Sequence, residues 1–263
     1  MKIVDSHMHV WSIDEVDYYE NKSLATYMLE NSIKKTSLIA LSQVENIKIA
    51  SVVESNPDKF FGIGYVDHQD QKDSLELLEK NVKAGVVRGI KLYPYSEHFM
   101  LDADEIKPIY RKCLDLDIPI LLHVGWQRST LVHPSQKGAK PAKYSTLGFP
   151  IQFGSVLESF PNLKMIFAHM GGNYYFECLG ICQRFPNVYM DTAWLQHYAE
   201  EQLPSRHLHE WIEHACKYLG SEKIMFGGEG TLPRDIEKCQ ISNEDKENIL
   251  GRTAMNLYKL GTA

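Results

Sequence analysis

Hydrophobic residues gather in short runs that end in a polar residue or a glycine, and such runs recur along the whole chain. Eight of them are expected to form strands, at residues 2–7, 36–42, 60–67, 88–94, 118–125, 164–172, 187–194 and 223–230. Several are continuously apolar, which is typical of parallel strands that helices cover. The pattern therefore predicts a parallel sheet.

Segments with helical spacing separate the predicted strands. They are expected over residues 43–56, 71–85, 104–116, 151–160, 203–220 and 242–260. The first and the fourth end before a proline, because the residue before proline is disfavoured in the α region. This alternation over 263 residues predicts a (β/α)8 (TIM) barrel, with residues 1–263 as a single domain. A doubly wound sheet is the alternative, but the first strand is not followed by a glycine-rich phosphate loop.

Composition narrows the function classes. The formal net charge is −6, and phosphate binding depends on clustered lysine and arginine, so a nucleic-acid partner is not expected. The sequence contains neither a run near the ~20 apolar residues of a membrane span nor the pattern of a signal peptide. The five cysteines lack metal-ligand spacing. We therefore expect a cytoplasmic protein without a membrane partner.

Polar residues that can bind a metal or move a proton stand at the ends of most predicted strands. These residues are His7, His9, Lys91, His123, His169, Asp191 and Glu229. In a parallel barrel the carboxyl ends of all strands meet on one face, where the loops build the active site. Each residue alone is compatible with a structural role. Together they would be costly to bury unpaired, which favours a shared ion or substrate.

The order and wording of these strand ends resemble the amidohydrolase superfamily. They are closest to its amidohydrolase-2 branch, the relatives of aminocarboxymuconate-semialdehyde decarboxylase. The segments concerned are DSHMHVW, GIKLYP, LLHVG, FAHMGGN, FGGEGTLP and the closing SNEDKENILGRTAMNLYKL. The resemblance spans essentially the whole chain. One departure is Glu229 in the segment Phe226–Gly227–Gly228–Glu229, where the branch usually has Phe-Gly-Ser-Asp.

The resemblance implies a metal site on this face of the barrel. One divalent ion, Zn²⁺ before Mn²⁺, is expected among His7, His9, His123 and Glu229, since imidazole and carboxylate suit such ions.

The remaining strand-end residues are expected to act on the substrate. His169 is expected to act as an acid or base, Glu229 to take a proton from water, and Lys91 to supply a positive charge near the substrate. In some subgroups this lysine is carboxylated and bridges two metals, so a binuclear site is the less favoured alternative.

Two further residues are candidates for contact with a small-molecule substrate. Arg128 lies in the long loop 126–150, which is expected to act as a lid, and its guanidinium suits a substrate carboxylate. Asp191 is expected to contact the substrate or to orient a ligand histidine. Dimers are common in the branch, so a homodimer is the oligomeric state that the resemblance suggests.

Three functions remain open at this stage. The first is a metal-dependent hydrolase that attacks a small amide, ester or lactone with a water activated by the metal. The second is a non-oxidative decarboxylase of an unsaturated or aromatic acid, which tolerates a displaced Glu229 but needs a cation such as Arg128 or Lys91. The third is a non-catalytic barrel with a relic site. We expect the hydrolase.

Overall fold

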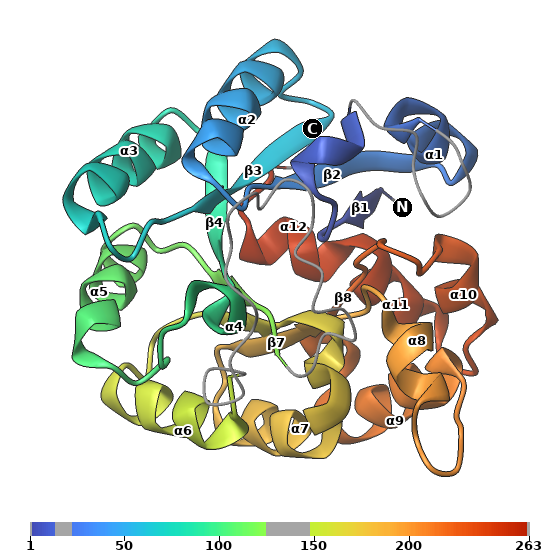
Figure 1. The fold of residues 1–263 in the computed structure, drawn as a ribbon. Coiled ribbons are helices and arrows are strands. Elements are labelled where there is room, and N and C mark those ends of the chain that lie inside the picture. The colour runs from blue at the N-terminus through green and yellow to red at the C-terminus, as the bar shows by residue number, and fades with distance from the viewer. Residues whose placement is uncertain (1, 14–22, 125–147, 262–263) are drawn as a thin grey trace.

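The computed structural model describes residues 2–13, 23–124 and 148–261 (Figure 1). Its strands form one eight-stranded parallel sheet whose spatial order follows the sequence. The strands are β1 (Ile3–Asp5), β2 (Ile33–Ile39), β3 (Phe60–Tyr65), β4 (Val87–Leu92), β5 (Ile120–Leu122), β6 (Met165–Phe167), β7 (Val188–Asp191) and β8 (Ile224–Met225). The predicted barrel class is confirmed, because alternating helices surround this sheet.

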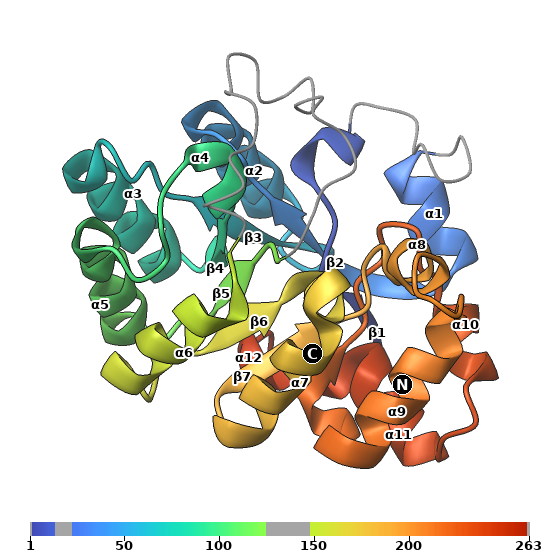
Figure 2. The same cartoon turned by 60° about the horizontal axis from the view of Figure 1, so that its bottom comes forward.

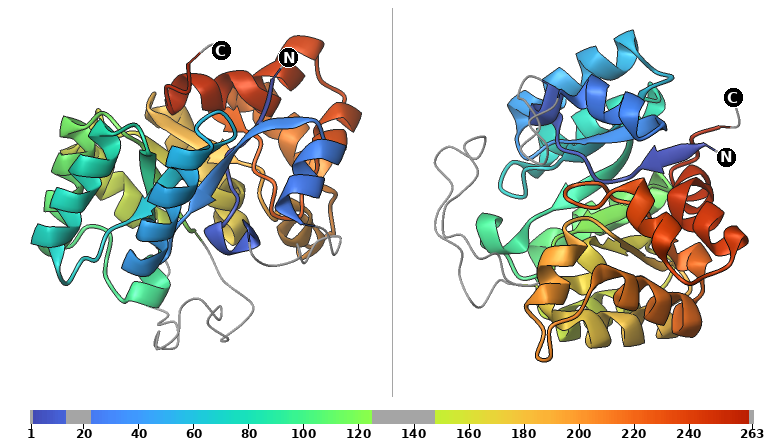
Figure 3. Two further views of the ribbon diagram at one scale, coloured as in Figure 1. Left: turned by 90° about the horizontal axis from the view of Figure 1, so that it is seen from above. Right: turned by 90° about the vertical axis from the view of Figure 1, so that its right-hand side faces the viewer.

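Most helices lie on the outside of the strands, whereas α12 lies near the centre in Figure 1 (Figures 1, 2 and 3). The α-helices are α1 (Leu24–Glu30), α2 (Gln43–Ser55), α3 (Gln71–Lys83), α4 (Pro94–Glu97), α5 (Lys107–Asp115), α6 (Pro150–Ser159), α7 (Tyr175–Arg184), α8 (Leu195–Glu200), α9 (Leu208–Leu219), α10 (Pro233–Lys238), α11 (Asn243–Glu247) and α12 (Thr253–Leu257). Short 3-10 segments are η1 (Val10–Ile13), η2 (Asp104–Ile106), η5 (Ala168–Tyr174) and η6 (Ser221–Lys223). Within the described ranges, no helix is long and apolar enough to cross a membrane.

The last predicted helix, residues 242–260, differs from a regular helix. It consists of α11, a π-helical segment η7 (Asn248–Arg252) and α12. The segment η7 packs closely on β1, since a Cβ added at Gly251 would overlap the carbonyl oxygen of Lys2. The carbonyl of Ile249 in this segment also accepts the Phe226 N–H at 2.7 Å. The C-terminal segment thus packs against both β1 and β8, and Figure 3 shows the red C-terminal helices beside the N-terminal strand.

Side chains from successive strands fill the barrel interior. The cluster includes Val4, Ile39, Phe61, Ile63, Leu121, Ile166, Met225 and Tyr258, all buried. The Tyr258 ring, just after α12, packs on that of Phe61 with centroids 5.0 Å apart, so the C-terminal helix covers this part of the interior. A larger apolar layer lies between the strands and the outer helices. The described polar residues of the predicted site lie toward the carboxyl ends of these strands and in the segments that follow them.

Candidate active site

Three of the predicted ligands come together where β1 and β8 meet. His7 and His9 follow β1 in extended backbone, and His9 still forms an isolated parallel bridge with Ile39. Their side chains therefore share one side of the strand. The distance from His7 Nε2 to Glu229 Oε2 is 3.3 Å, and that from His9 Nε2 to Glu229 Oε1 is 3.6 Å. Both imidazoles are buried, and the Glu229 side chain is 14% exposed.

Glu229 reaches this position from a turn rather than from a strand. The prediction that residues 223–230 form a strand is wrong beyond Met225, where β8 ends. Glu229 has a positive φ of 35°, and its carbonyl accepts the Trp194 N–H at 2.7 Å. The left-handed backbone turns the chain back toward β1. This turn directs the Glu229 carboxylate at His7 and His9.

Asp191 fixes the ring orientation of His7. Its Oδ2 lies 2.7 Å from His7 Nδ1, and its Oδ1 accepts the N–H groups of His169 at 2.9 Å and Ala193 at 3.1 Å. Because an ionised carboxylate can only accept a hydrogen bond, His7 must donate to Asp191 from Nδ1. Neutral His7 therefore has its lone pair on Nε2. Burial, together with Lys91, holds the pKa of His7 well below its usual value, which keeps the ring neutral. Both Asp191 oxygens are used by the protein, so the geometry favours the orienting role over substrate contact.

His169 lies in the 3-10 segment η5, which follows β6. The predicted strand 164–172 is therefore wrong beyond Phe167, where β6 ends. Its backbone is left-handed, with φ 58°, and its Nδ1 donates to the carbonyl of Ala193 at 2.7 Å. The Nε2 of neutral His169 is therefore an acceptor, and it lies 3.3 Å from Nδ1 of His123. Burial, with a smaller contribution from His7, lowers the pKa of His169 to about 3.

His123 follows β5 and lies beside His169 rather than within the three-residue cluster. Since His123 Nδ1 donates to His169, its Nε2 carries a lone pair, and this buried atom has no hydrogen-bond partner among the described residues. Burial, with the neighbouring His169, lowers the pKa of His123 well below its usual value. A buried lone pair without a donor is costly. Its chemistry fits a metal ligand or a substrate acceptor.

The cluster of His7, His9 and Glu229 fits a divalent cation. One ligand atom from each residue lies within 4.8 Å of the others. Two ligands of a tetrahedral ion at about 2.1 Å lie roughly 3.4 Å apart, close to the observed 3.3 and 3.6 Å. The His7 lone pair also faces a carboxylate oxygen, an arrangement that a cation between them stabilises. The donor set of nitrogen and oxygen atoms suits Zn²⁺ or Mn²⁺.

Lys91 lies in β4 and is almost completely buried, with 1% of its surface exposed. Its Nζ is 3.3 Å from His7 Nε2 and 4.7 Å from the centre of the Tyr93 ring. Burial lowers the pKa of Lys91 to about 8, while the charges of Asp191 and Glu229 oppose this shift. Lys91 is thus a buried cation beside the candidate metal position.

Aromatic residues flank His123 and His169. Tyr93 stacks on His123 with centroids 5.0 Å apart, Tyr95 packs on it at 4.9 Å, and Tyr198 lies 5.5 Å from His169. Tyr95 and Tyr198 are not among the residues predicted from the sequence. Each belongs to a helix, α4 or α8, that is too short to show a periodic pattern. Arg128, the predicted contact for a substrate carboxylate, lies outside the described residues.

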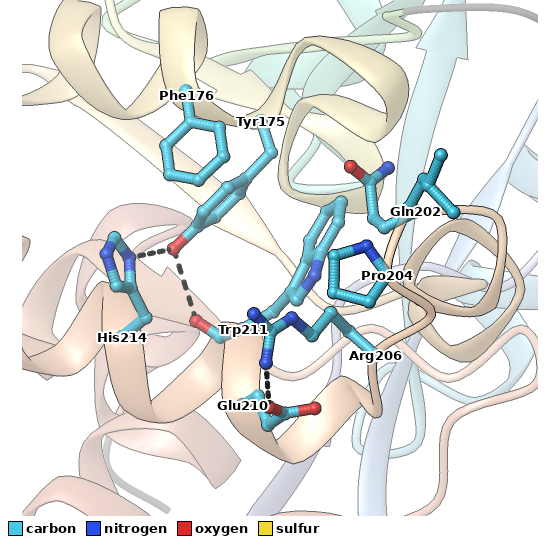
Figure 4. Close-up of a pocket in the computed structure, with 9 residues that line it drawn as sticks. Tyr175, Phe176, Gln202, Pro204, Arg206, Glu210, Trp211 and His214 are labelled. Atoms are coloured by element: carbon cyan, nitrogen blue, oxygen red, sulfur yellow. Dashed lines mark hydrogen bonds and ion pairs between the residues drawn. The ribbon is translucent and has the colours of Figure 1, made fainter.

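A separate cavity of about 350 Å³ lies between α7, α9 and the segment that joins α8 to α9 (Figure 4). Its walls include Tyr175, Trp211 and His214, and the Tyr175 hydroxyl lies 2.7 Å from His214 Nδ1. Arg206 pairs with Glu210 at its edge at 2.9 Å. The residues around this cavity include no member of the predicted site, so the candidate chemistry lies elsewhere.

Comparison with known proteins shows the family of this chain. An amidohydrolase family model matches residues 4–260, and the chain belongs to this family, in its amidohydrolase-2 branch. It is 24% identical over 253 residues to 2-amino-3-carboxymuconate-6-semialdehyde decarboxylase of Dictyostelium discoideum, covering 86% of this chain and 68% of that protein. It is 29% identical over 140 residues to 2-keto-4-carboxy-3-hexenedioate hydratase of a Sphingobium species, covering 50% of this chain and 40% of that protein.

A solved structure with the same fold is dihydroxybenzoic acid decarboxylase of Polaromonas sp., which contains manganese and the inhibitor 2-nitroresorcinol. The TM-score is 0.70 at 16% identity, with 100% of this chain and 98% of that chain covered. Relatives of this chain are thus mainly decarboxylases. The expectation of a hydrolase has less support than the alternative of a decarboxylase.

Proposed function

We propose that this protein is a metal-dependent, non-oxidative decarboxylase of a small unsaturated or aromatic carboxylic acid. The observation that carries the proposal is the convergence of His7, His9 and Glu229, with His169 nearby, in a chain whose relatives include decarboxylases. In this proposal His7, His9 and Glu229 hold one divalent ion, and His123 Nε2 supplies a fourth contact to the ion or to substrate. The ion acts as a Lewis acid when it is bound.

The protein's own groups bind the acid and move the proton. Lys91 attracts an anionic oxygen of the substrate, and the rings of Tyr93 and Tyr95 lie beside His123, where a planar substrate can pack. The carbon–carbon bond to the carboxylate breaks, CO₂ leaves, and the bonding electron pair stays on the substrate carbon. His169 Nε2 then passes a proton from water to that carbon, and hydroxide is left behind.

The local structure suits His169 to this step. Its Nδ1–H is held by the Ala193 carbonyl, so only Nε2 exchanges a proton. Burial lowers the pKa of His169 to about 3, so the ring is neutral near pH 7 and would hold this proton only while passing it from water to the carbanion.

A second candidate is the addition of water to a small unsaturated acid. The similarity to 2-keto-4-carboxy-3-hexenedioate hydratase favours it over amide or ester hydrolysis. Hydration would use the same ligands and differ in the product, which would gain water and lose no carbon.

Product analysis separates the two candidates. Metal-free protein is reloaded with Mn²⁺ or Zn²⁺ and incubated with dihydroxybenzoates, carboxymuconate-type acids, lactones and amides. We expect CO₂ release from at least one acid, lost on chelation and in His169→Ala. His214→Ala, in the outer cavity, should retain wild-type turnover. Addition of water or hydrolysis without CO₂ release would overturn the decarboxylase proposal.

A further inference from the structure

A buried hydrogen-bond cluster lies behind the candidate ligands, where β1 approaches the segment after β8. Asp5 is fully buried. Its Oδ1 accepts the backbone N–H groups of His7 at 3.0 Å and Gly228 at 2.8 Å, and its Oδ2 accepts the Tyr27 hydroxyl at 3.1 Å. One carboxylate therefore joins the two backbone segments that carry the ligands, and ties both to α1.

Gly228 lies so close to the Asp5 carboxylate that no residue with a Cβ fits at this position. A Cβ added at this position would overlap Asp5 Oδ2 and lie 2.5 Å from the Tyr27 hydroxyl oxygen. The Gly228 carbonyl also accepts the Thr231 N–H at 2.8 Å, so both of its backbone polar groups are held. Glycine at 228 thus lets the β8 segment contact the carboxylate of Asp5 directly.

The hydrogen bonds of Asp5 affect the distance between His7 and Glu229. His7 is two residues after Asp5, and Glu229 is the residue after Gly228. Because one carboxylate oxygen binds the backbone of both segments, a shift at Asp5 changes the separation between His7 Nε2 and Glu229 Oε2, now 3.3 Å. We infer that Asp5, acting through Gly228 and supported by Tyr27, is a positioning residue that sets the separation between the β1 histidines and Glu229.

This inference rests on the proposed function, because it concerns the metal site that the proposal assigns to His7, His9 and Glu229. Asp5 itself does not reach the ion or the substrate, since its oxygens accept from protein groups. A purely structural Asp5 would affect the thermal stability of the metal-free protein and leave the affinity of the folded protein for metal unchanged. Metal affinity therefore separates the two roles.

The chain offers a conservative substitution and matched controls. In Asp5→Asn the amide oxygen still accepts both N–H groups, and the amide nitrogen can donate to the Tyr27 oxygen. Tyr110→Phe removes another buried hydroxyl, which donates to the Leu101 carbonyl at 2.7 Å on the outer side of the barrel. Gly62→Ala adds a methyl group in β3, 2.5 Å from Ile49 Cγ2.

The experiment titrates metal-free protein with Mn²⁺ by calorimetry and records the Tm of each metal-free variant. Asp5→Ala and Gly228→Ala should weaken Mn²⁺ binding by about 10- to 100-fold, the usual range for groups that orient ligands. Asp5→Asn should stay within about threefold of wild type on the same scale. Tyr110→Phe and Gly62→Ala should lower Tm without changing the affinity.

Each result decides one of the two proposals. If wild-type protein binds no Mn²⁺ or Zn²⁺, the proposed function is overturned. If it binds Mn²⁺ and Gly228→Ala binds it equally well, the positioning role is overturned while the proposed function stands. If Asp5→Ala does not fold, Gly228→Ala and Asp5→Asn still give the two opposite results that the inference requires.

Discussion

Shortening Glu229 by one methylene tests whether its backbone is held where the structure places it. Glu229→Asp restores the residue that is usual in the amidohydrolase-2 branch. Gly228 is held by Asp5 and Thr231, and the Glu229 carbonyl is held by Trp194, so the segment has little freedom to move inward. The carboxylate of the aspartate should therefore withdraw from both histidines.

The size of the effect follows from the distances. Withdrawal by up to one carbon–carbon bond, about 1.5 Å, would lengthen the 3.3 Å separation from His7 Nε2 to roughly 4.8 Å. Two ligands at about 2.1 Å from one ion can be at most roughly 4.2 Å apart. The carboxylate would lose direct contact with an ion held by the histidines. We expect metal affinity to fall by at least about 100-fold, equivalent to roughly 2.7 kcal/mol.

Calorimetric titration of metal-free Glu229→Asp with Mn²⁺ and Zn²⁺ measures this loss. Glu229→Gln is the matched control, because it keeps the length of the side chain and removes its charge. Affinity in Glu229→Asp equal to or higher than wild type would refute the reasoning, since it would mean that the segment moves freely enough to compensate.

Four other substitutions test separate parts of the account. His169→Ala should lower kcat by about 10²- to 10⁴-fold with metal content unchanged, as steady-state kinetics and metal analysis would measure. Asp191→Asn should weaken metal binding by about 10- to 100-fold, because the amide has a single acceptor oxygen and its NH2 group must face either His7 Nδ1–H or the backbone N–H groups of His169 and Ala193; unchanged affinity would contradict the orienting role. Lys91→Met should raise affinity for the divalent ion by at least about tenfold, since it removes a positive charge beside His7, and should raise KM for an acidic substrate. Phe153→Ala, in the apolar layer, should cost about 3–5 kcal/mol in denaturant unfolding and leave metal affinity unchanged.

The barrel was predictable from the sequence because its strands are short apolar runs that alternate with helical patterns. The order of the eight strands follows from the same alternation. The short helices α4, α8 and α10 were not foreseen, since helices of four to six residues have too few turns to show a periodic pattern.

The sequence indicated which residues belong to the candidate site, but it did not indicate their arrangement. Side-chain alternation places His7 and His9 on one side, and in the structure both rings lie close to the Glu229 carboxylate. The left-handed turns at His169 and Glu229 depend on hydrogen bonds to Ala193, Asp191 and Trp194. Such tertiary contacts leave no local pattern in the sequence. Asp5 was visible in DSHMHVW, but its partner Gly228 lies 223 residues away, so its link to β8 could not be inferred.

Anomalous X-ray scattering at the Mn or Zn absorption edge, from crystals grown with the ion, tests the central claim most directly. We expect one peak bonded to His7 Nε2, His9 Nε2 and a Glu229 oxygen at about 2.0–2.2 Å. A crystal that contains the ion at other residues and none at this position would contradict it.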